Sequence, residues 1–371
     1  MTAQTVRVEL AGDGGRDRSY DITVGQGILA SVGTLLADAG CRRAVTIADA
    51  AVVSSHAEKV VTSLQAAGIE TLPIEVASGE SSKAAGEAAR IWGALAEAAV
   101  DRKTHVVAIG GGVVGDLAGF VAATYVRGLA VWQIPTTLVA QVDSAIGGKT
   151  GINLPAGKNL VGCFWQPRGV VSDIESLATL PLRELRSGLA EVVKYGMIRD
   201  EPFFRWLETH VDEITAATPT AVHHIILTSS RHKAEVVSQD EHETTGLRAI
   251  LNYGHTFAHA FESASGYGRF LHGEAVSLGM AAAARLACRL GRIDAETAER
   301  QDRLLAALGL PINFANVASS LSINELLAIM RRDKKAISGQ LRFVLPSRIG
   351  HVELVDGIDP ADVADVLAAK A

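Results

Sequence analysis

The sequence predicts an α/β domain built on a parallel sheet, followed by a mainly α-helical region. Short apolar runs alternate with helical patterns in the first half of the chain, whereas helical periodicity dominates after about residue 180. The composition agrees, because 48% of the 371 residues are hydrophobic and only 20% are charged, which supplies a large core and excludes global disorder. We expect two domains, at residues 1–178 and 179–371.

Strands are expected where apolar residues alternate with polar ones or form short buried runs. In the first domain they are residues 6–10, 20–24, 44–48, 71–76, 105–109 and 129–134. Helical patterns lie between them at residues 56–67 and 83–99. Strands that alternate with helices favour a parallel α/β layer.

The second domain is expected to be mainly α-helical, with one late strand. The predicted helices are residues 182–195, 202–215, 221–237, 251–263, 274–290 and 295–308, and the strand is residues 340–345. The sequence has no internal repeat and no low-complexity segment.

Charge and cysteine content exclude several classes of protein. The formal net charge of −6 disfavours a nucleic-acid binder or a basic membrane-surface protein. The apolar region 106–123 is interrupted by glycines and Asp116, so we expect no membrane span, and residues 1–10 contain no signal-peptide core. The three cysteines are widely spaced and odd in number, which argues against a disulfide framework or a CxxC metal site and fits a reducing cytoplasm.

A glycine-rich segment follows the expected strand 105–109. Gly110, Gly112 and Gly115 fit the G-x-G-x-x-G pattern, in which backbone N–H groups approach a phosphate at a helix N-terminus. The acid that ordinary dinucleotide domains carry about 20 residues later is missing, and Asp116 directly follows the loop instead. The segment therefore indicates a dinucleotide loop of an unusual kind, the alternative being a turn needed only for close strand–helix packing.

A second resemblance to a phosphate site is rejected. Gly148, Lys149 and Thr150 match the end of a P-loop, but that motif needs a glycine where this chain has Asp143. Lys149 and Lys158 still lie among glycines and turn residues, where lysines suit phosphate as point charges. Ordinary surface lysines in a solvated loop are the alternative.

Three histidines predict a metal site. His255 and His259 are four residues apart and share one helix face, and His272 follows in a glycine-bearing turn. Such imidazoles can converge on a metal ion that keeps an open coordination position. The alternative is a pair of buried, hydrogen-bonded histidines. A metal, a dinucleotide and anion-binding lysines together indicate alcohol chemistry on a substrate that carries phosphate or carboxylate.

These motifs resemble, in order and over nearly the whole chain, those of the 3-dehydroquinate synthase family of sugar-phosphate cyclases. They are residues 78–83 (SGESSK), 110–116 (GGGVVGD), 135–138 (PTTL), 141–151 (QVDSAIGGKTG), 158–162 (KNLVG), 188–196 (GLAEVVKYG), 246–259 (GLRAILNYGHTFAH) and 272–274 (HGE). The resemblance implies a Rossmann-like parallel-sheet domain at the N-terminus and a mainly α-helical domain at the C-terminus.

The resemblance changes the metal-site prediction. It implies Glu191, His255 and His272 as ligands of one divalent metal, zinc or alternatively cobalt, and places His259 on the substrate side. Glu191 and Lys194 are one helical turn apart, so one helix can present a carboxylate to the metal and an ammonium to the substrate. A solvated ion pair is the usual alternative for such spacing.

The resemblance also implies two larger sets of residues. Those implied to bind NAD are Asp49, Glu80, Lys83, Gly111, Gly112, Asp116, Thr136, Thr137, Lys149, Lys158, Thr179 and Leu180. Those implied to act on the substrate are Asp143, Lys149, Lys158, Asn159, Lys194, Lys233, Arg248, Asn252, His259, Lys334 and Lys335. The planar fork of Arg248 suits a carboxylate.

The chain departs from the family pattern at two places. Ala51 stands two positions after Asp49, where the family often has asparagine. The segment 241–246 is one residue longer than usual, so the family's acidic residue maps to Glu243 with a shift of one position.

The activity implied is conversion of 3-deoxy-D-arabino-heptulosonate 7-phosphate to 3-dehydroquinate and phosphate, in the shikimate pathway of aromatic amino acid biosynthesis. It proceeds by transient NAD-dependent oxidation, β-elimination of phosphate, re-reduction and aldol closure. The alternatives are a sister cyclase of the 2-deoxy-scyllo-inosose or valiolone type, a metal-dependent polyol dehydrogenase and a non-catalytic NAD-binding derivative. The lysines disfavour the dehydrogenase, the run from Arg248 to Asn252 favours a carboxylate substrate, and the complete site disfavours the derivative. A homodimer is expected from the family, with no nucleic-acid or membrane partner.

Overall fold

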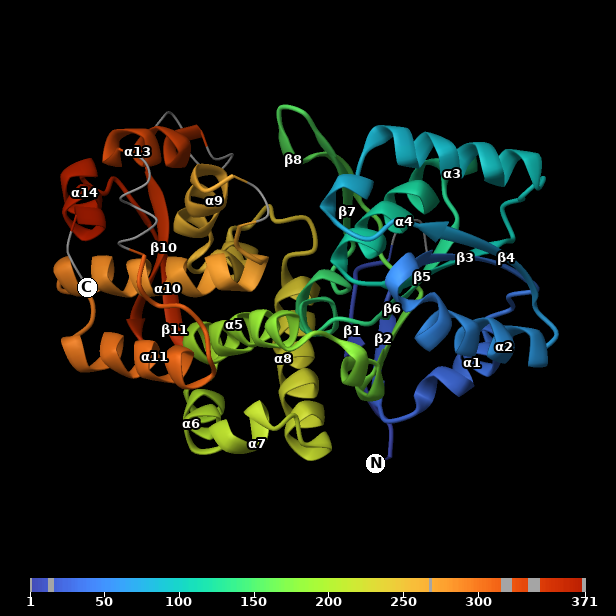
Figure 1. Cartoon of the computed structure of the whole chain (residues 1–371), viewed down its shortest axis with the longest axis horizontal. Helices are drawn as coiled ribbons and strands as arrows, with labels where there is room; N and C mark the ends of the chain where they lie inside the picture. Colours follow the sequence, from blue (N-terminus) through green and yellow to red (C-terminus); the bar gives the residue numbers. More distant parts are fainter. Residues whose placement is uncertain (1, 13–16, 267–268, 315–321, 333–340, 369–371) are drawn as a thin grey trace. The chain divides into compact units, whose positions relative to one another are not determined.

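The computed structural model describes residues 2–12, 17–266, 269–314, 322–332 and 341–368, which form two compact units (Figure 1). The first unit consists of Met1–Pro181 and Val222–His242, and the second of Leu182–Ala221 and Glu243–Ala371. The division expected at residues 178 and 179 assigned the whole 221–237 helix to the second domain. In the structure most of this helix, α8 (Pro219–Gln239), belongs to the first unit.

A seven-stranded sheet in the order β1-β2-β9-β6-β5-β3-β4 forms the centre of the first unit. Its neighbouring strands are parallel, apart from the antiparallel pair of β1 and β2 at one edge. The strands are β1 (Gln4–Val8), β2 (Tyr20–Gly25), β3 (Arg43–Asp49), β4 (Glu70–Val76), β5 (His105–Gly110), β6 (Ala130–Pro135) and β9 (Gly169–Asp173). The expected parallel α/β layer is confirmed.

Helices cover both faces of this sheet (Figure 1). They are α1 (Val32–Asp38), α2 (Glu58–Ala66), α3 (Ala85–Glu97) and α4 (Gly112–Thr124). Val106 and Ala108 of β5 pack in one cluster with α3 and α4, while Val107 and Ile109 pack in another with α1 and α2. Because both faces are buried, β5 is a continuous apolar run rather than an alternating one.

The six strands expected in the first half are all present, with ends displaced by no more than two residues. Strand β9 and the antiparallel hairpin of β7 (Lys149–Leu154) and β8 (Gly157–Phe164) were not expected. The segment of β9 is only five residues long, and β8 contains glycines and a run of four exposed residues, so neither carries a clear period of two.

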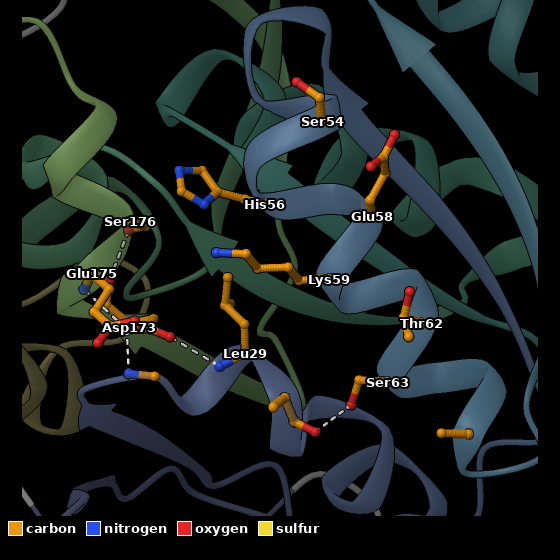
Figure 2. Close-up of a pocket in the computed structure, with 13 residues that line it drawn as sticks. Leu29, Ser54, His56, Glu58, Lys59, Thr62, Ser63, Asp173, Glu175 and Ser176 are labelled. Carbon is orange, nitrogen blue, oxygen red and sulfur yellow. Dashed lines mark hydrogen bonds between the residues drawn. The ribbon is translucent and has the colours of Figure 1, made fainter.

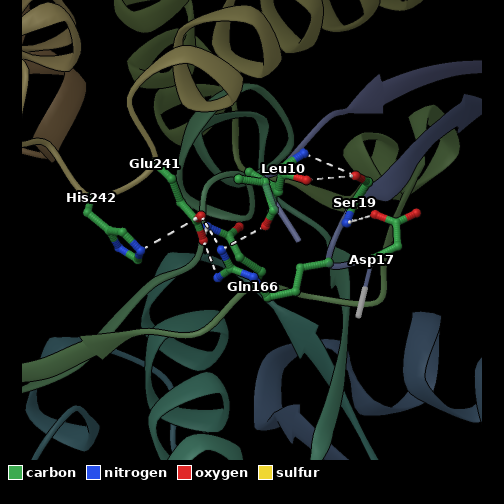
Figure 3. Close-up of polar contacts among 8 residues, drawn as sticks. Leu10, Asp17, Ser19, Gln166, Glu241 and His242 are labelled. Carbon is green, nitrogen blue, oxygen red and sulfur yellow. Dashed lines mark hydrogen bonds and ion pairs between the residues drawn. The ribbon is translucent and has the colours of Figure 1, made fainter. Parts of the chain in front are cut away.

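Just after the end of α8, Glu241 makes hydrogen bonds and an ion pair with residues of the first unit (Figure 3). Arg18 donates hydrogen bonds of 2.8 and 2.7 Å to the two carboxylate oxygens, and Gln166 Nε2 donates a third of 3.1 Å. His242 Nε2 lies 3.8 Å from the same carboxylate. Glu241 is thus held within the first unit, two residues before the second unit begins at Glu243.

The second unit is mainly α-helical, as expected. Its elements are α5 (Leu182–Arg199), α6 (Glu201–Thr209), α7 (Val211–Thr215), α9 (His255–Ala264), α10 (His272–Arg289), α11 (Ala295–Ala307), α13 (Ile323–Arg332), α14 (Pro360–Ala368) and the antiparallel strands β10 (Arg342–Arg348) and β11 (His351–Asp356). Within the ranges described, none of the helices has the length and apolar character that crossing a membrane requires.

Two predicted helices of this unit were wrong in detail. The stretch 202–215 is interrupted at His210, whose Nδ1 lies 2.8 Å from the Trp206 carbonyl and takes the place of a continuing backbone hydrogen bond. The stretch 251–263 is broken, because Leu251 and Asn252 end a 3-10 helix (Leu247–Asn252) and Gly254 adopts a left-handed conformation with φ of 80°, so that the α-helix begins at His255. Lys334 and Lys335, predicted to act on the substrate, lie outside the described residues.

Candidate active site

Glu191, His255 and His272 converge in the second unit. Their nearest ligand atoms all lie within 4.8 Å of one another. His255 Nε2 is 3.6 Å and His272 Nε2 is 3.3 Å from Glu191 Oε1. One carboxylate and two imidazoles form a donor set typical of catalytic zinc, with a coordination position left for substrate or water. The residues present therefore fit a divalent metal ion.

Three helices bring these side chains together. Glu191 lies within α5, whereas His255 and His272 are the first residues of α9 and α10. Ser187 is four residues before Glu191, and its hydroxyl accepts a hydrogen bond of 3.0 Å from the amide of Gly273. This contact caps the start of α10 with a side chain from the α5 face that carries Glu191.

Two glycines of α10 permit this close approach. A Cβ atom on Gly273 would lie 1.8 Å from the Ser187 carbonyl oxygen, and one on Gly279 would lie 2.1 Å from the Gly254 carbonyl oxygen. Any side chain at either position would separate α10 from α5 or from α9. The geometry of the three candidate ligands therefore depends on glycines that never touch a metal.

Each imidazole is oriented through the ring nitrogen that faces away from Glu191. His255 Nδ1 lies 3.2 Å from the backbone carbonyl oxygen of Tyr253, so a proton on Nδ1 leaves Nε2 available as a ligand. His272 Nδ1 lies 3.9 Å from Oε1 of Glu262. Glu262 was not predicted from the sequence, although its position seven residues after His255 places both on one face of α9.

The two carboxylates also govern the protonation of His272. Partial burial by itself favours the neutral ring, but the nearby carboxylates of Glu191 and Glu262 outweigh it and raise the pKa of His272 to about 10. The site without metal therefore favours an imidazolium, and a bound cation would replace that proton.

Lys194 and Glu191 form a buried ion pair. Their side chains are 1% and 0% exposed, so the alternative of a solvated surface pair does not describe them. A buried ammonium is costly unless it is paired, which makes Glu191 a partner of Lys194 as well as a candidate ligand. The predicted arrangement on one helix turn of α5 is present.

The other predicted substrate-side residues of the second unit lie near this cluster in sequence. His259 packs edge-on against His255, with ring centroids 5.7 Å apart. Arg248 is 1% exposed and is among the largest fully buried side chains. Asn252 Nδ2 donates to Glu243 Oε1 over 3.3 Å. Because Glu241 is engaged with Arg18, this contact favours Glu243 as the acid that matches the family position.

In the first unit, the glycine-rich segment forms a turn between β5 and α4. Gly111 is the N-cap of α4 and makes no side-chain cap hydrogen bond. A Cβ on Gly112 would lie 2.8 Å from Ser144 Oγ, and one on Gly111 would lie 3.1 Å from Thr137 Cγ2. These two positions therefore have no room for a larger residue, and the backbone amides at the start of a 13-residue helix suit a phosphate group.

An acid at the end of an earlier strand lies beside the loop. Asp49 ends β3, which is the direct neighbour of β5 in the sheet. A Cβ placed on Gly110 would lie 3.1 Å from Asp49 Cβ. The Asp49 carboxylate accepts from Ser78 Oγ and, over 2.9 Å, from the amide of Ala51. Ala51, which stands where the family often has asparagine, therefore still orients Asp49 through its backbone amide.

Lys83 and Asp116 form a second, partly buried ion pair beside the loop, with side chains 5% and 20% exposed. Burial raises the pKa of the Asp116 carboxyl, and the charge of Lys83 opposes that shift. Nearby, Asn153 Nδ2 donates a 2.7 Å hydrogen bond to Glu80 Oε1. Lys83, Asp116 and Glu80, all predicted to bind NAD, thus lie together near the loop in the first unit.

Lysines predicted to bind anions lie on or beside the β7–β8 hairpin. Lys149 is the exposed first residue of β7, and Lys158 and Asn159 lie at the start of β8. Asn159 has φ of 54°, and its amide donates to Asn153 Oδ1 over 2.9 Å. Lys233 of α8 is buried and donates to the carbonyl and carboxylate oxygens of Asp143, both over 2.6 Å.

A pocket of about 580 Å³ lies in the first unit (Figure 2). Its lining includes His56, Lys59, Asp173 and Ser176, and none of its lining residues was predicted to bind a cofactor, metal or substrate. It borders one predicted NAD residue, because His56 Nε2 lies 2.8 Å from Thr179 Oγ1. Of the other predicted positions, Thr136 and Thr137 follow β6, and Leu180 ends the turn Ile174–Thr179.

Two family models match adjoining parts of the chain. The model of the 3-dehydroquinate synthase N-terminal domain matches residues 73–187, and that of the C-terminal domain matches residues 188–336. A 3-dehydroquinate synthase of Rhodopirellula baltica is 47% identical over 362 residues, which are 95% of this chain and 96% of the relative.

Two solved structures share the fold with a TM-score of 0.86. One is 2-deoxy-scyllo-inosose synthase with carbaglucose-6-phosphate, NAD+ and Co2+, at 25% identity, covering 99% of this chain and 100% of that one. The other is 2-epi-5-epi-valiolone synthase of Streptomyces hygroscopicus with NAD+ and Zn2+, at 28% identity, covering 96% and 98%. The expected fold class is confirmed.

Proposed function

The chain belongs to the 3-dehydroquinate synthase family, and on this premise we propose that it converts 3-deoxy-D-arabino-heptulosonate 7-phosphate to 3-dehydroquinate and phosphate. The reaction is a carbon–oxygen lyase reaction without net oxidation, so NAD is needed only in catalytic amounts. The observation that carries the proposal is the cluster of Glu191, His255 and His272 beside the buried ammonium of Lys194.

Glu191, His255 and His272 would hold one divalent metal ion, zinc or cobalt. When bound, the metal supplies a Lewis acid for substrate hydroxyls, and NAD supplies a reversible hydride acceptor. Lys194 would donate to a substrate oxygen next to the metal position, where its charge stabilises an oxyanion. Its contact with Glu191 fixes the direction of the ammonium before substrate arrives.

The first unit would hold NAD. The amides at the start of α4, with Gly111 and Gly112, offer a place for the pyrophosphate. Asp49, Glu80 and Lys83 supply polar groups for the rest of the dinucleotide. The remaining members of the proposed set are Asp116, Thr136, Thr137, Lys149, Lys158, Thr179 and Leu180.

We assign the substrate phosphate and carboxylate to different cations. Lys149, Lys158 and Asn159 carry donors on an exposed hairpin and would bind the phosphate. Arg248 presents five donors in a planar fork and would bind the carboxylate. Asn252 and His259 would orient the sugar hydroxyls, and the His259 imidazole can hold or move a proton. Lys233 would keep Asp143 ionised and directed.

The choice among cyclases rests on similarity. The Rhodopirellula baltica relative shares 47% of its residues with this chain, whereas the 2-deoxy-scyllo-inosose and valiolone synthases share 25% and 28%. A buried arginine in the second unit agrees with a carboxylate substrate. We also propose a cytoplasmic homodimer, as the family resemblance implies, which light scattering of the purified protein would test.

The deciding experiment measures phosphate release from 3-deoxy-D-arabino-heptulosonate 7-phosphate with catalytic NAD, with and without a chelator, while NADH is monitored. Release in excess of the NAD supplied, stopped by the chelator and without NADH accumulation, supports the proposal. NADH accumulation with polyols indicates a dehydrogenase instead. Activity only on sugar phosphates that lack a carboxylate indicates a sister cyclase. His272→Ala should lose metal and activity while keeping its fold, and equal metal content in that variant would contradict the ligand assignment.

A further inference from the structure

Glu262 lies behind the candidate metal ligand His272, on the side of the ring away from Glu191. Its carboxylate oxygen Oε1 is 3.9 Å from His272 Nδ1, whereas the other ring nitrogen, Nε2, is 3.3 Å from Glu191 Oε1. The imidazole therefore stands between two carboxylates, with one nitrogen facing each. A metal held by Glu191 would meet Nε2 and leave Nδ1 to Glu262.

The two candidate histidine ligands are held in different ways. His255 is 11% exposed, and its Nδ1 faces the backbone carbonyl of Tyr253 at 3.2 Å. His272 is 39% exposed, so packing restrains its ring less. The side chain that faces its Nδ1 is Glu262, which is 9% exposed and belongs to the same helix as His255. Helix α9 thus supplies the candidate ligand His255 and, through Glu262, would orient the other candidate ligand, His272.

We propose that Glu262 is the positioning residue of the metal site: its carboxylate keeps the proton of neutral His272 on Nδ1 and so directs the Nε2 lone pair to the metal. Carboxylates behind metal-binding histidines fix the tautomer and raise the basicity of the ligand nitrogen. At 3.9 Å the contact is longer than a direct hydrogen bond, so Glu262 acts mainly through its charge and the direction in which it holds the ring. The inference rests on the metal site of the proposed function.

The test compares zinc affinity in three full-length proteins by competition with a chromophoric chelator. Glu262→Gln keeps the size of the side chain and removes its charge. Asp302→Asn is the matched control, because Asp302 is also a largely buried carboxylate of the second unit but pairs with Arg285 at 3.1 Å. We expect zinc affinity to fall about 10- to 100-fold in Glu262→Gln and to remain within a factor of about two to three in Asp302→Asn, the context scatter of such measurements.

A second measurement separates positioning from general damage to the fold. Nitrogen-15 NMR of the His272 ring at high pH, in the protein without metal, reports which nitrogen carries the proton. The proton should reside on Nδ1 in the unaltered protein and shift toward Nε2 in Glu262→Gln. A purely structural role for Glu262 would not move this equilibrium. Glu262→Asp, which keeps the charge, should recover part of the lost affinity.

The outcomes are distinguishable. Tight zinc binding by the unaltered protein with equal affinity in Glu262→Gln overturns the role of Glu262 and leaves the metal site intact. Equal losses in Glu262→Gln and Asp302→Asn overturn it too, because the effect would then follow from removing any buried charge. Absence of zinc binding in all three proteins overturns the metal site itself, and the proposed function with it.

Discussion

Replacing Gly279 by alanine tests whether close packing of α9 and α10 sets the geometry of the candidate metal site. Two effects oppose each other. Alanine is a better helix former than glycine by about 1 kcal/mol, which favours the variant. The new Cβ, however, would lie 2.1 Å from the Gly254 carbonyl oxygen and 2.9 Å from the Ala258 amide nitrogen.

The steric effect should win. Ordinary contacts to a Cβ begin at 3.4 Å, so the two helices must separate by about 1 Å or more. The colliding atoms belong to the backbone and cannot rotate away. Overpacking of a dense core by one methylene costs about 1–3 kcal/mol, and this site lies at the upper end. After the helix-forming gain is subtracted, we expect the variant to lose roughly 2 kcal/mol of stability in α9 and α10.

Hydrogen exchange of peptides that cover α9 and α10 measures this loss directly, since it reports the free energy of local opening. The same displacement moves His255 relative to His272, and a shift of about 1 Å in a catalytic constellation can cost on the order of 100-fold in rate. The matched control is Gly93→Ala in α3, where the added Cβ meets nothing within 4 Å. It should gain about 1 kcal/mol.

The reasoning is refuted if Gly279→Ala increases protection as Gly93→Ala does and leaves zinc affinity and kcat/KM unchanged. The close contact would then be incidental to the positions of His255 and His272. Loss of protection without loss of zinc affinity would show that the cluster tolerates helix separation, which contradicts the second half of the argument.

Three further outcomes are expected. Lys83→Met should weaken NAD binding and destabilise the first unit by roughly 2–4 kcal/mol at pH 8, below the ~3–5 kcal/mol of a fully buried pair because Asp116 keeps 20% exposure. Burial raises the pKa of Asp116, so the Asp116 charge opposes folding once Lys83 is removed. The loss of stability in Lys83→Met should therefore shrink as pH falls, because Asp116 becomes protonated in both the folded and the unfolded state. Urea unfolding at a series of pH values checks this trend, and its absence would contradict the assignment. Arg248→Lys should raise the substrate KM about 10- to 100-fold, since a charged hydrogen bond contributes about 1.5–3 kcal/mol, and an unchanged KM would remove Arg248 from the site. Zinc at 100 times its Kd should stabilise the second unit by about 2.7 kcal/mol, and thermal unfolding of His255→Ala should show no such gain.

The sequence predicts the layers of the first unit well because buried parallel strands are recognisable as continuous apolar runs. The run from Val106 to Ile109 is apolar throughout, and the structure buries alternate residues against opposite helical layers. Strand β9 is too short to show a period, and exposed positions interrupt the pattern of β8, so neither is evident from the sequence. Their strand character depends on partners that are distant in the chain.

The dinucleotide loop illustrates the limit of spacing rules. The expected acid about 20 residues after the glycines presupposes that the neighbouring strand follows them in sequence. In this sheet β5 has two neighbours: β6, which follows the glycines and ends at Pro135 without an acid, and β3, which precedes them in the chain and ends at Asp49. A motif read along the chain could not reveal this, because strand order is a property of the sheet.

The candidate metal site shows the same limit for helices. The spacing of His255 and His259 places both on one face of α9, and three histidines were a reasonable first ligand set. Spacing gives the face of a helix but not the helix that packs against it. Here Gly273 lets α10 approach α5 and Gly279 lets it approach α9, so that a buried glutamate joins His255 and His272 while His259 stays edge-on to His255. A resemblance between sequences can identify the candidate ligands. Residues that contact those ligands, Glu262 above all, are identified only from the packing of the helices. The strongest test of the site is therefore a change that touches no ligand and still alters metal affinity.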